Sequence, residues 1–211
     1  MANISKELVV VLATSVLSLE SGIHAIPAAA VTLTTDTTTF FNSNPIVSTT
    51  EFSRPGITFP GSSVTINSVT YTNPQASSWQ TIVVGRPPNF DFALIPESSN
   101  ELPDVLSFGS NQSVNAIGLH LPLITPLIRR PPDLPFPEFN FIVEETEGTL
   151  TTFSSRLENG FEGFFGFSSE VGIKTLTVFQ QLGQEVRRNW AYGDVYRSAV
   201  TQSAGSCSAF K

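Results

Sequence analysis

The chain has 211 residues, of which 40% are hydrophobic and only 14% are charged, and 17 are phenylalanine. Its formal net charge of −7 argues against nucleic acid and anionic membranes as partners, because neither would be attracted to an acidic protein. The length and the apolar content predict a single domain with a sizeable core.

The first thirty residues have the pattern of a secretory signal peptide. Residues 8–19 form an apolar run that is too short to span a bilayer, and Ala28-Ala29-Ala30 after Pro27 forms an A-x-A cleavage site. A buried N-terminal helix is the alternative, but the run has no polar face. We therefore expect a mature chain that begins near Val31, is secreted or held at the cell surface or in the periplasm, and has no transmembrane anchor.

The middle of the chain predicts one short helix and many short strands. Asp36 is a good N-cap for a helix over residues 37–44, which ends before Pro45. Strands are predicted where apolar and polar residues alternate, weakly or strongly, and where β-branched and aromatic residues are frequent. They fall at residues 31–33, 46–52, 57–59, 63–67, 69–72, 78–84 and 90–95. Residues 105–121 predict an aromatic strand that ends at Phe108-Gly109, a polar turn, and a second, alternating strand at residues 116–121.

The last third contains the strongest strand pattern. Residues 122–137 are too rich in proline for a central strand and predict an extended surface loop. Residues 139–145 and 149–155 predict a hairpin around Glu147-Gly148. Residues 163–167 and 173–179 predict two strands joined by a polar turn at 168–172, and residues 190–196 predict the last strand.

About a dozen short strands with one helix are typical of an all-β, antiparallel β-sandwich of the jelly-roll type. We place this domain at residues 31–198, with residues 122–137 as a surface loop. Residues 199–211, which contain Cys207, the only cysteine of the sequence, are expected to form a flexible tail.

Several motifs occur in a defined order along residues 34–198. They are TTTFFNSNP, TTEF, GITF, FGSNQSVNAIGL, FFGFSSEVGIKTLTVF and Gly193-Asp194-Val195. In this order they resemble the jelly-roll domain of PEP-CTERM-type exported proteins of cyanobacteria and proteobacteria. The family's C-terminal Pro-Glu-Pro sorting signal is not present, and residues 122–137 look like an insertion. The resemblance implies export and a carbohydrate-binding-module-like sandwich, and it implies no catalytic activity.

The residues needed for catalysis are scarce. Beyond the signal peptide His120 is the only histidine, and its place in an alternating strand makes a surface or interface role the expected one. A metal site built from histidine and cysteine is excluded by their number. Glycoside hydrolysis would need two carboxylates across a cleft, and spacing alone does not pair the candidates. These candidates are Glu138, Glu144, Glu145, Glu147, Glu158 and Glu162, for which solvated surface charge is the alternative.

The resemblance also implies a structural calcium ion. Carbohydrate-binding-like jelly rolls use an early acidic residue and one on the last strand, and the matching positions here are Glu51 and Asp194. Otherwise, Asp194 caps a strand end or pairs with an arginine, for which Arg187, Arg188 and Arg197 are candidates. No other cofactor is expected.

Sugar binding would require exposed aromatic faces. The main candidates are Trp79, Trp190 and Tyr192, with Tyr71 and Tyr196 as further ones, although core packing is the more common role for large aromatic residues in a sandwich. Arg129 and Arg130 could contact an anionic polymer, or could simply be solvated loop charges.

The sequence therefore suggests an exported, non-catalytic protein that binds polysaccharide or another surface component. The alternatives are a polysaccharide-acting enzyme with paired carboxylates and a structural or adhesive envelope protein.

Overall fold

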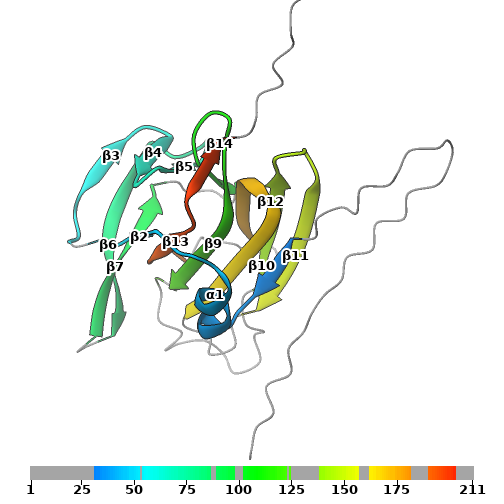
Figure 1. Ribbon diagram of the computed structural model, residues 1–211. Coiled ribbons are helices and arrows are strands. Elements are labelled where there is room, and N and C mark those ends of the chain that lie inside the picture. The colour runs from blue at the N-terminus through cyan, green and yellow to red at the C-terminus, as the bar shows by residue number, and fades with distance from the viewer. Residues whose placement is uncertain are drawn as a thin grey trace, which may run out of the picture.

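The computed structural model describes residues 31–52, 54–86, 89–97, 102–122, 124, 138–156, 162–181 and 190–202. In this part of the chain, antiparallel strands form a nearly closed, barrel-like sandwich, accompanied by one helix (Figure 1). The predicted all-β, antiparallel sandwich of the jelly-roll type, with a short helix near residue 40, is thereby confirmed. None of the helical residues described forms a segment long and apolar enough to cross a membrane.

Three predicted segments lie outside the described residues. They are the signal peptide at residues 1–30, residues 125–137 of the proline-rich loop, and the end of the tail with Cys207.

The sandwich has two layers and a small additional sheet. The first layer consists of β1 (Thr32–Thr34), β2 (Ser48–Thr50), β9 (Gln112–Pro122), β13 (Val195–Arg197), β14 (Val200–Gln202) and the first part of β12 (Glu162–Gln181). The second layer consists of β4 (Ser63–Ile66), β5 (Val69–Thr72), β8 (Asp104–Ser107), β10 (Glu138–Glu145), β11 (Leu150–Arg156) and the second part of β12. The additional sheet consists of β3 (Thr58–Pro60), β6 (Ser78–Arg86) and β7 (Asn89–Pro96).

Strand β12 belongs to both layers. Its residues 162–168 pair with β9, whereas its residues from 173 onward pair with β10 and β8. The strand bends at Gly172, whose φ of 96° is readily adopted only by glycine. The register with β10 also shifts between Glu144 and Glu145, which is where this bend is accommodated. The prediction of two strands separated by a turn is therefore corrected to one bent strand.

The core fills the space between the two layers. Phe165 and Phe167 of β12 point inward and meet Phe141 of β10, with ring centroids 4.8 and 5.0 Å apart. Burying a side chain of this size contributes about 1.5–3 kcal/mol. The predicted hairpin around Glu147-Gly148 is confirmed as β10–β11, and this places Phe141 in the same core.

Helix α1 (Thr37–Ser43) covers the outer side of the first layer. Asp36 caps it as predicted, because its Oδ1 accepts a hydrogen bond of 2.8 Å from the backbone nitrogen of Thr39. Phe40 is fully buried on this outer side, against Gly118, Gly166 and Phe164. The two glycines leave the room that the phenyl ring needs.

The domain extends beyond the predicted boundary at residue 198. Val200 pairs with Val114 in the β14–β9 ladder, and the hydroxyl groups of Thr201 and Ser113 are 3.1 Å apart. The start of the predicted tail is therefore a strand of the first layer. The short polar sequence did not reveal it, because its pairing depends on a partner far away in the chain.

We expect Gly166→Ala to destabilise the fold by about 1–3 kcal/mol, because the new methyl group would overlap the Phe40 ring. Urea unfolding of the purified protein measures this loss. The double variant Gly166→Ala/Phe40→Leu should recover part of it, because leucine is smaller and can move aside. Equal stabilities for wild type and Gly166→Ala would show that the helix does not pack as described.

Candidate functional site

The aromatic residues proposed for sugar binding lie in the core. Trp79 and Tyr192 are completely buried and Trp190 is 3% exposed. Their rings contact one another and Tyr71, with centroids 5.1 to 6.4 Å apart. Their faces are not available to a sugar, and core packing is the role that the structure gives them. The physical reason is that β6 and β7 need a large apolar surface where they meet the rest of the sandwich.

A buried polar contact reinforces this aromatic cluster. The hydroxyl of Tyr192 donates to Asp104 Oδ2 at 2.9 Å, and the side-chain amide of Asn73 donates to Asp104 Oδ1 at 2.8 Å. Two backbone hydrogen bonds between Tyr192 and Leu94 tie the segment before β13 to β7. Tyr192 therefore joins the small sheet to the first layer, which is a structural role.

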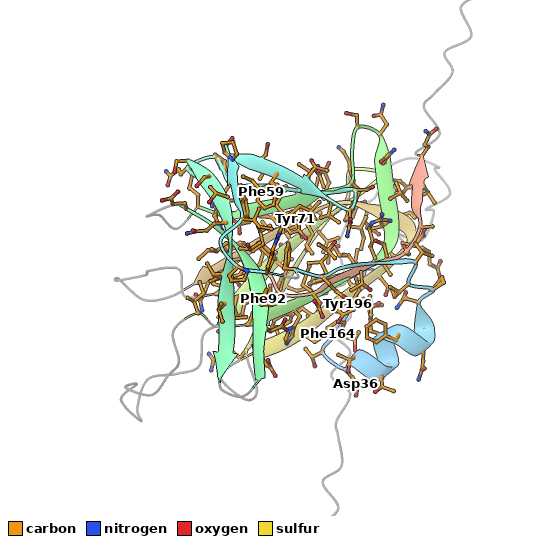
Figure 2. All side chains as sticks on the ribbon, turned by 90° about the vertical axis from the view of Figure 1, so that its left-hand side faces the viewer. Asp36, Phe59, Tyr71, Phe92, Phe164 and Tyr196 are labelled. Carbon is orange, nitrogen blue, oxygen red and sulfur yellow. The ribbon has the colours of Figure 1, made fainter. Side chains whose placement is uncertain are left out.

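A different group of side chains gathers on the outer side of the first layer. Figure 2 shows Phe164 and Tyr196 beside the helix, on the side of β12 and β13 that faces away from the core. Outward positions alternate with core positions such as Leu119 and Val195. We call this surface the acidic face, and it consists of Phe41, Glu51, Asp91, His120, Glu162, Phe164, Asp194 and Tyr196.

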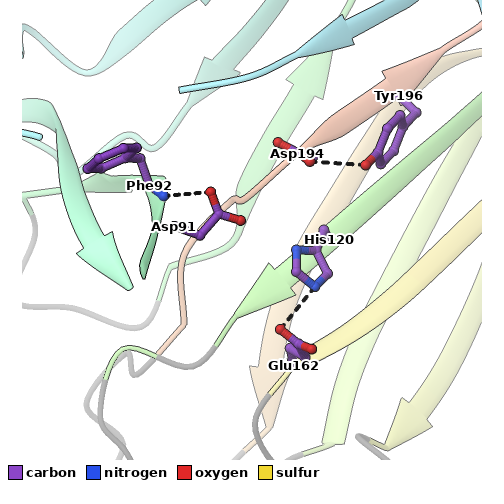
Figure 3. Close-up of polar contacts among 6 residues, drawn as sticks. All are labelled: Asp91, Phe92, His120, Glu162, Asp194 and Tyr196. Carbon is purple, nitrogen blue, oxygen red and sulfur yellow. Dashed lines mark hydrogen bonds and ion pairs between the residues drawn. The ribbon is translucent and has the colours of Figure 1, made fainter. Parts of the chain in front are cut away.

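His120 lies on this face beside a carboxylate. Its Nε2 is 3.3 Å from Glu162 Oε2, and the two side chains are 27% and 56% exposed (Figure 3). The backbone of His120 is hydrogen-bonded to Gly193 and Asp194 on the neighbouring segment. A Cβ atom on Gly193 would be only 3.0 Å from His120 Nδ1, so glycine allows this close approach. His120 was expected to be a surface or interface residue, and the structure adds a carboxylate partner that the sequence did not indicate.

Asp194 and Glu51 lie at the same end of one ladder. Thr50 of β2 pairs with Val195 of β13. Glu51 directly follows Thr50 and Asp194 directly precedes Val195, so both acidic residues lie at this end of the antiparallel ladder. The hydroxyl of Tyr196 donates to Asp194 Oδ2 at 3.0 Å (Figure 3). The calcium site that the resemblance implies at these two residues stays a prediction.

The environment of Tyr196 is both buried and negative. Burial is the largest cause that raises the pKa of its hydroxyl, followed by the charge of Asp194 and then those of Glu51 and Asp91. Asp91 of β7 was not a candidate in the sequence. Only the docking of the small sheet against the first layer brings it here, and no local pattern indicates that docking.

No group of three or more histidine, cysteine, aspartate or glutamate residues in the described part of the chain could hold a metal ion together. Arg197, proposed as a partner of Asp194, instead donates to the carbonyl oxygens of Asn67 and Ser198. Arg187 and Arg188 lie outside the described residues, as do Arg129 and Arg130.

An aromatic edge borders the carboxylates. Phe41 of α1 is 40% exposed and meets Tyr196 edge to face, with ring centroids 4.9 Å apart. Phe164 lies beneath both rings, at 6.1 Å from Phe41 and 6.3 Å from Tyr196. Phe41 is the exposed aromatic residue that the sequence analysis missed. Two adjacent residues of a helix do not point to the same side, so a buried Phe40 could have indicated that Phe41 is exposed.

Besides Glu162, which lies beside His120, three of the glutamates proposed for hydrolysis have structural partners. Glu138 pairs with Arg156 at 3.1 Å, and Glu144 pairs with Lys174 at 2.7 Å. The hydrogen bond from Lys174 is the largest cause that lowers the pKa of Glu144. Glu145 is buried and accepts a hydrogen bond of 2.6 Å from Ser169 Oγ beside the bend of β12. Glu158 lies outside the described residues.

Comparisons with known protein families, with curated proteins and with solved structures found no match for this chain. The resemblance to PEP-CTERM-type exported domains therefore stays a prediction from the motifs. Any function has to be argued from the acidic face and from the open surfaces of the sandwich.

Asp194→Asn should lower the pKa of Tyr196 toward its ordinary value, because it removes the largest charge contribution. Burial should still keep the pKa above that value. Because the folded-state pKa is raised, Tyr196 contributes stability below about pH 10 that is lost as the pH rises further. NMR titration of ¹³C-labelled tyrosine measures the change.

Tyr71 provides the internal control for this titration. Its pKa is also raised, with burial as the largest cause, and Asp194 is not among the causes. It should therefore titrate alike in wild type and in Asp194→Asn. An unchanged Tyr196 titration in the variant would contradict the arrangement in Figure 3.

Proposed function

We propose that the protein is an exported, non-catalytic β-sandwich that acts at the cell surface or in the extracellular matrix and binds polysaccharide or another surface component through its acidic face. The observation that carries this proposal is the exposed Phe41–Tyr196 edge directly beside the carboxylate of Asp194.

The chemistry of this face suits a sugar. Pyranose rings present C–H groups that pack against aromatic side chains, and their hydroxyl groups donate hydrogen bonds to carboxylates. Phe41 offers the aromatic surface, while Asp194 and Glu162 offer acceptor oxygens. Strands β9, β12 and β13 hold the polar groups on a rigid sheet, which limits the ordering cost of binding.

A non-catalytic role agrees with the contacts of four of the six candidate glutamates. Glu138 and Glu144 are occupied by ion pairs, and Glu145 is buried behind Ser169. Glu162 is engaged by His120. These contacts favour binding over hydrolysis, which would need two carboxylates free to act on one glycosidic bond.

A calcium ion held by Glu51 and Asp194 is a further part of this proposal. Carboxylates are the hard oxygen ligands that Ca²⁺ prefers, but two of them fall short of the six to eight ligand oxygens that it takes. Backbone carbonyls and water would have to supply the rest. Such an ion would neutralise the repulsion between the two carboxylates.

The proposal of export depends on residues 1–30 and on the motif resemblance. If the protein is exported, its single cysteine forms no internal disulfide, so its stability must come from the core.

On a glycan array, we expect the wild-type protein to bind at least one polysaccharide. Phe41→Ala and Asp194→Asn should each weaken binding about fivefold to tenfold, because the first removes the aromatic contact and the second removes a charged acceptor. Val83→Ala is the matched control, because Val83 is a similarly exposed apolar residue on β6, at 47% exposure. Binding that is equal in all four proteins would exclude the acidic face as the site.

For the ion, adding EDTA to protein purified in calcium should lower the melting temperature, and Glu51→Gln should abolish that response. Scanning fluorimetry with and without EDTA measures it. The same melting temperature in both conditions would remove calcium from the proposal and leave sugar binding untouched.

A further inference from the structure

Two hydrogen-bond donors in the core lack a protein partner. They are the hydroxyl group of Tyr71 and the indole N–H of Trp79, and both side chains are completely buried. Neither atom has a hydrogen-bond partner among the described residues. Buried polar groups of folded proteins are nearly always hydrogen-bonded, either to protein or to ordered water. Two unpaired donors on neighbouring side chains therefore point to a bound molecule that accepts from both.

The two donors belong to the aromatic cluster around Tyr192. The ring centroids of Tyr71 and Trp79 are 6.0 Å apart. Two groups that share one small molecule lie up to about 6 Å apart, which is twice the length of a hydrogen bond. The ring of Trp79 is also 6.4 Å from that of Tyr192, whereas Tyr192 is 5.3 Å from Tyr71 and 5.1 Å from Trp190. The packing of this cluster is thus widest around the indole.

Thr50 of β2 brings a third polar group to the same place, and its side chain is almost completely buried. Burial is the largest cause acting on the pKa of Tyr71 and raises it, and the neighbouring Thr50 hydroxyl lowers it. The geometry of the two hydroxyl groups nevertheless falls short of a hydrogen bond. Thr50, Tyr71 and Trp79 belong to the first layer, the second layer and the small sheet, so this is where the three sheets meet.

We infer that one internal water molecule is bound at this junction, where it accepts hydrogen bonds from Trp79 and Tyr71 and donates one to the hydroxyl oxygen of Thr50. The indole N–H can only donate, so its partner must be an acceptor. Buried water molecules typically make about three hydrogen bonds to polar groups that have no other partner. The junction supplies that number of groups.

Other occupants fit this site less well. The carboxylate of Asp104 accepts a hydrogen bond from Tyr192 in the same cluster, so a bound anion would be a second buried negative charge beside it. A larger organic molecule would have to separate rings that are already in contact. An N–H···π contact from Trp79 to a tyrosine ring would satisfy the indole but would leave the Tyr71 hydroxyl unpaired. One water molecule satisfies both donors.

The water would help to hold the small sheet against the two layers. Strand β6, which carries Trp79, pairs with β7, which carries Asp91 of the acidic face. The site thereby supports the position of one carboxylate of that face. It is buried, however, and does not depend on any ligand bound at the surface. The inference therefore goes beyond the proposed function.

Urea unfolding of Tyr71→Phe tests the inference through the sign of the change. If the hydroxyl is bound to water, its removal loses a hydrogen bond, and the equilibrium constant for folding should fall about threefold to tenfold. If the hydroxyl is unpaired, its removal relieves a buried polar group and raises the constant. Tyr192→Phe is the matched control, because it removes a hydroxyl with a known partner and should lower the constant. An unchanged or raised constant in Tyr71→Phe overturns the inference.

NMR distinguishes bound water from a direct bond between Tyr71 and Thr50. Water-selective NOE spectra of the ¹⁵N-labelled full chain should show a cross-peak between water and the indole N–H of Trp79, because the water oxygen would lie about 3 Å from that nitrogen. The chain has two tryptophans, so Trp190→Phe assigns the two indole resonances. No water cross-peak at Trp79 overturns the inference even where Tyr71→Phe lowers the folding constant, since Thr50 would then be the partner.

Discussion

The fold depends on one strand that belongs to both layers of the sandwich. Strand β12 pairs with β9 before Gly172 and with β10 and β8 after it. A shift of one residue in either ladder would turn the inward phenylalanines outward, since neighbouring side chains on a strand point to opposite faces. The core on one side of the bend therefore fixes the register on the other. This coupling determines which residues reach both outer surfaces.

Much of this architecture could be predicted from local patterns. The alternation in residues 173–179, the cap at Asp36 and the turn residues Glu147-Gly148 each indicate their element, because the signal lies within a few residues. The bend of β12 and strand β14 could not be predicted in the same way. A polar stretch such as 168–172 has the same composition in a turn and in a strand that changes neighbours, and only long-range pairing distinguishes the two.

The same difference explains the outcome for the candidate site. Aromatic type suggested Trp79 and Tyr192 as sugar contacts, but a residue type does not say which face of a sheet it occupies, and both proved to be core. Glu51 and Asp194, named from the family resemblance, follow β2 and precede β13 at the Thr50–Val195 end of that ladder. The His120–Glu162 contact depends on the β9–β12 register, and the approach of Asp91 depends on the docking of a separate sheet. Neither leaves a local trace in the sequence.

Charge is distributed unequally between the two outer surfaces, and this gives each of them a different chemistry. On the second layer, Glu138 and Glu144 each have a cationic partner, so that surface is close to neutral. On the first layer, the carboxylates around Tyr196 have no such cation among the described contacts, and their negative charge raises the pKa of that hydroxyl further than burial alone does. Because this negative charge lies beside the exposed ring of Phe41, the acidic face is the surface on which the proposed binding of hydroxyl donors or a cation rests.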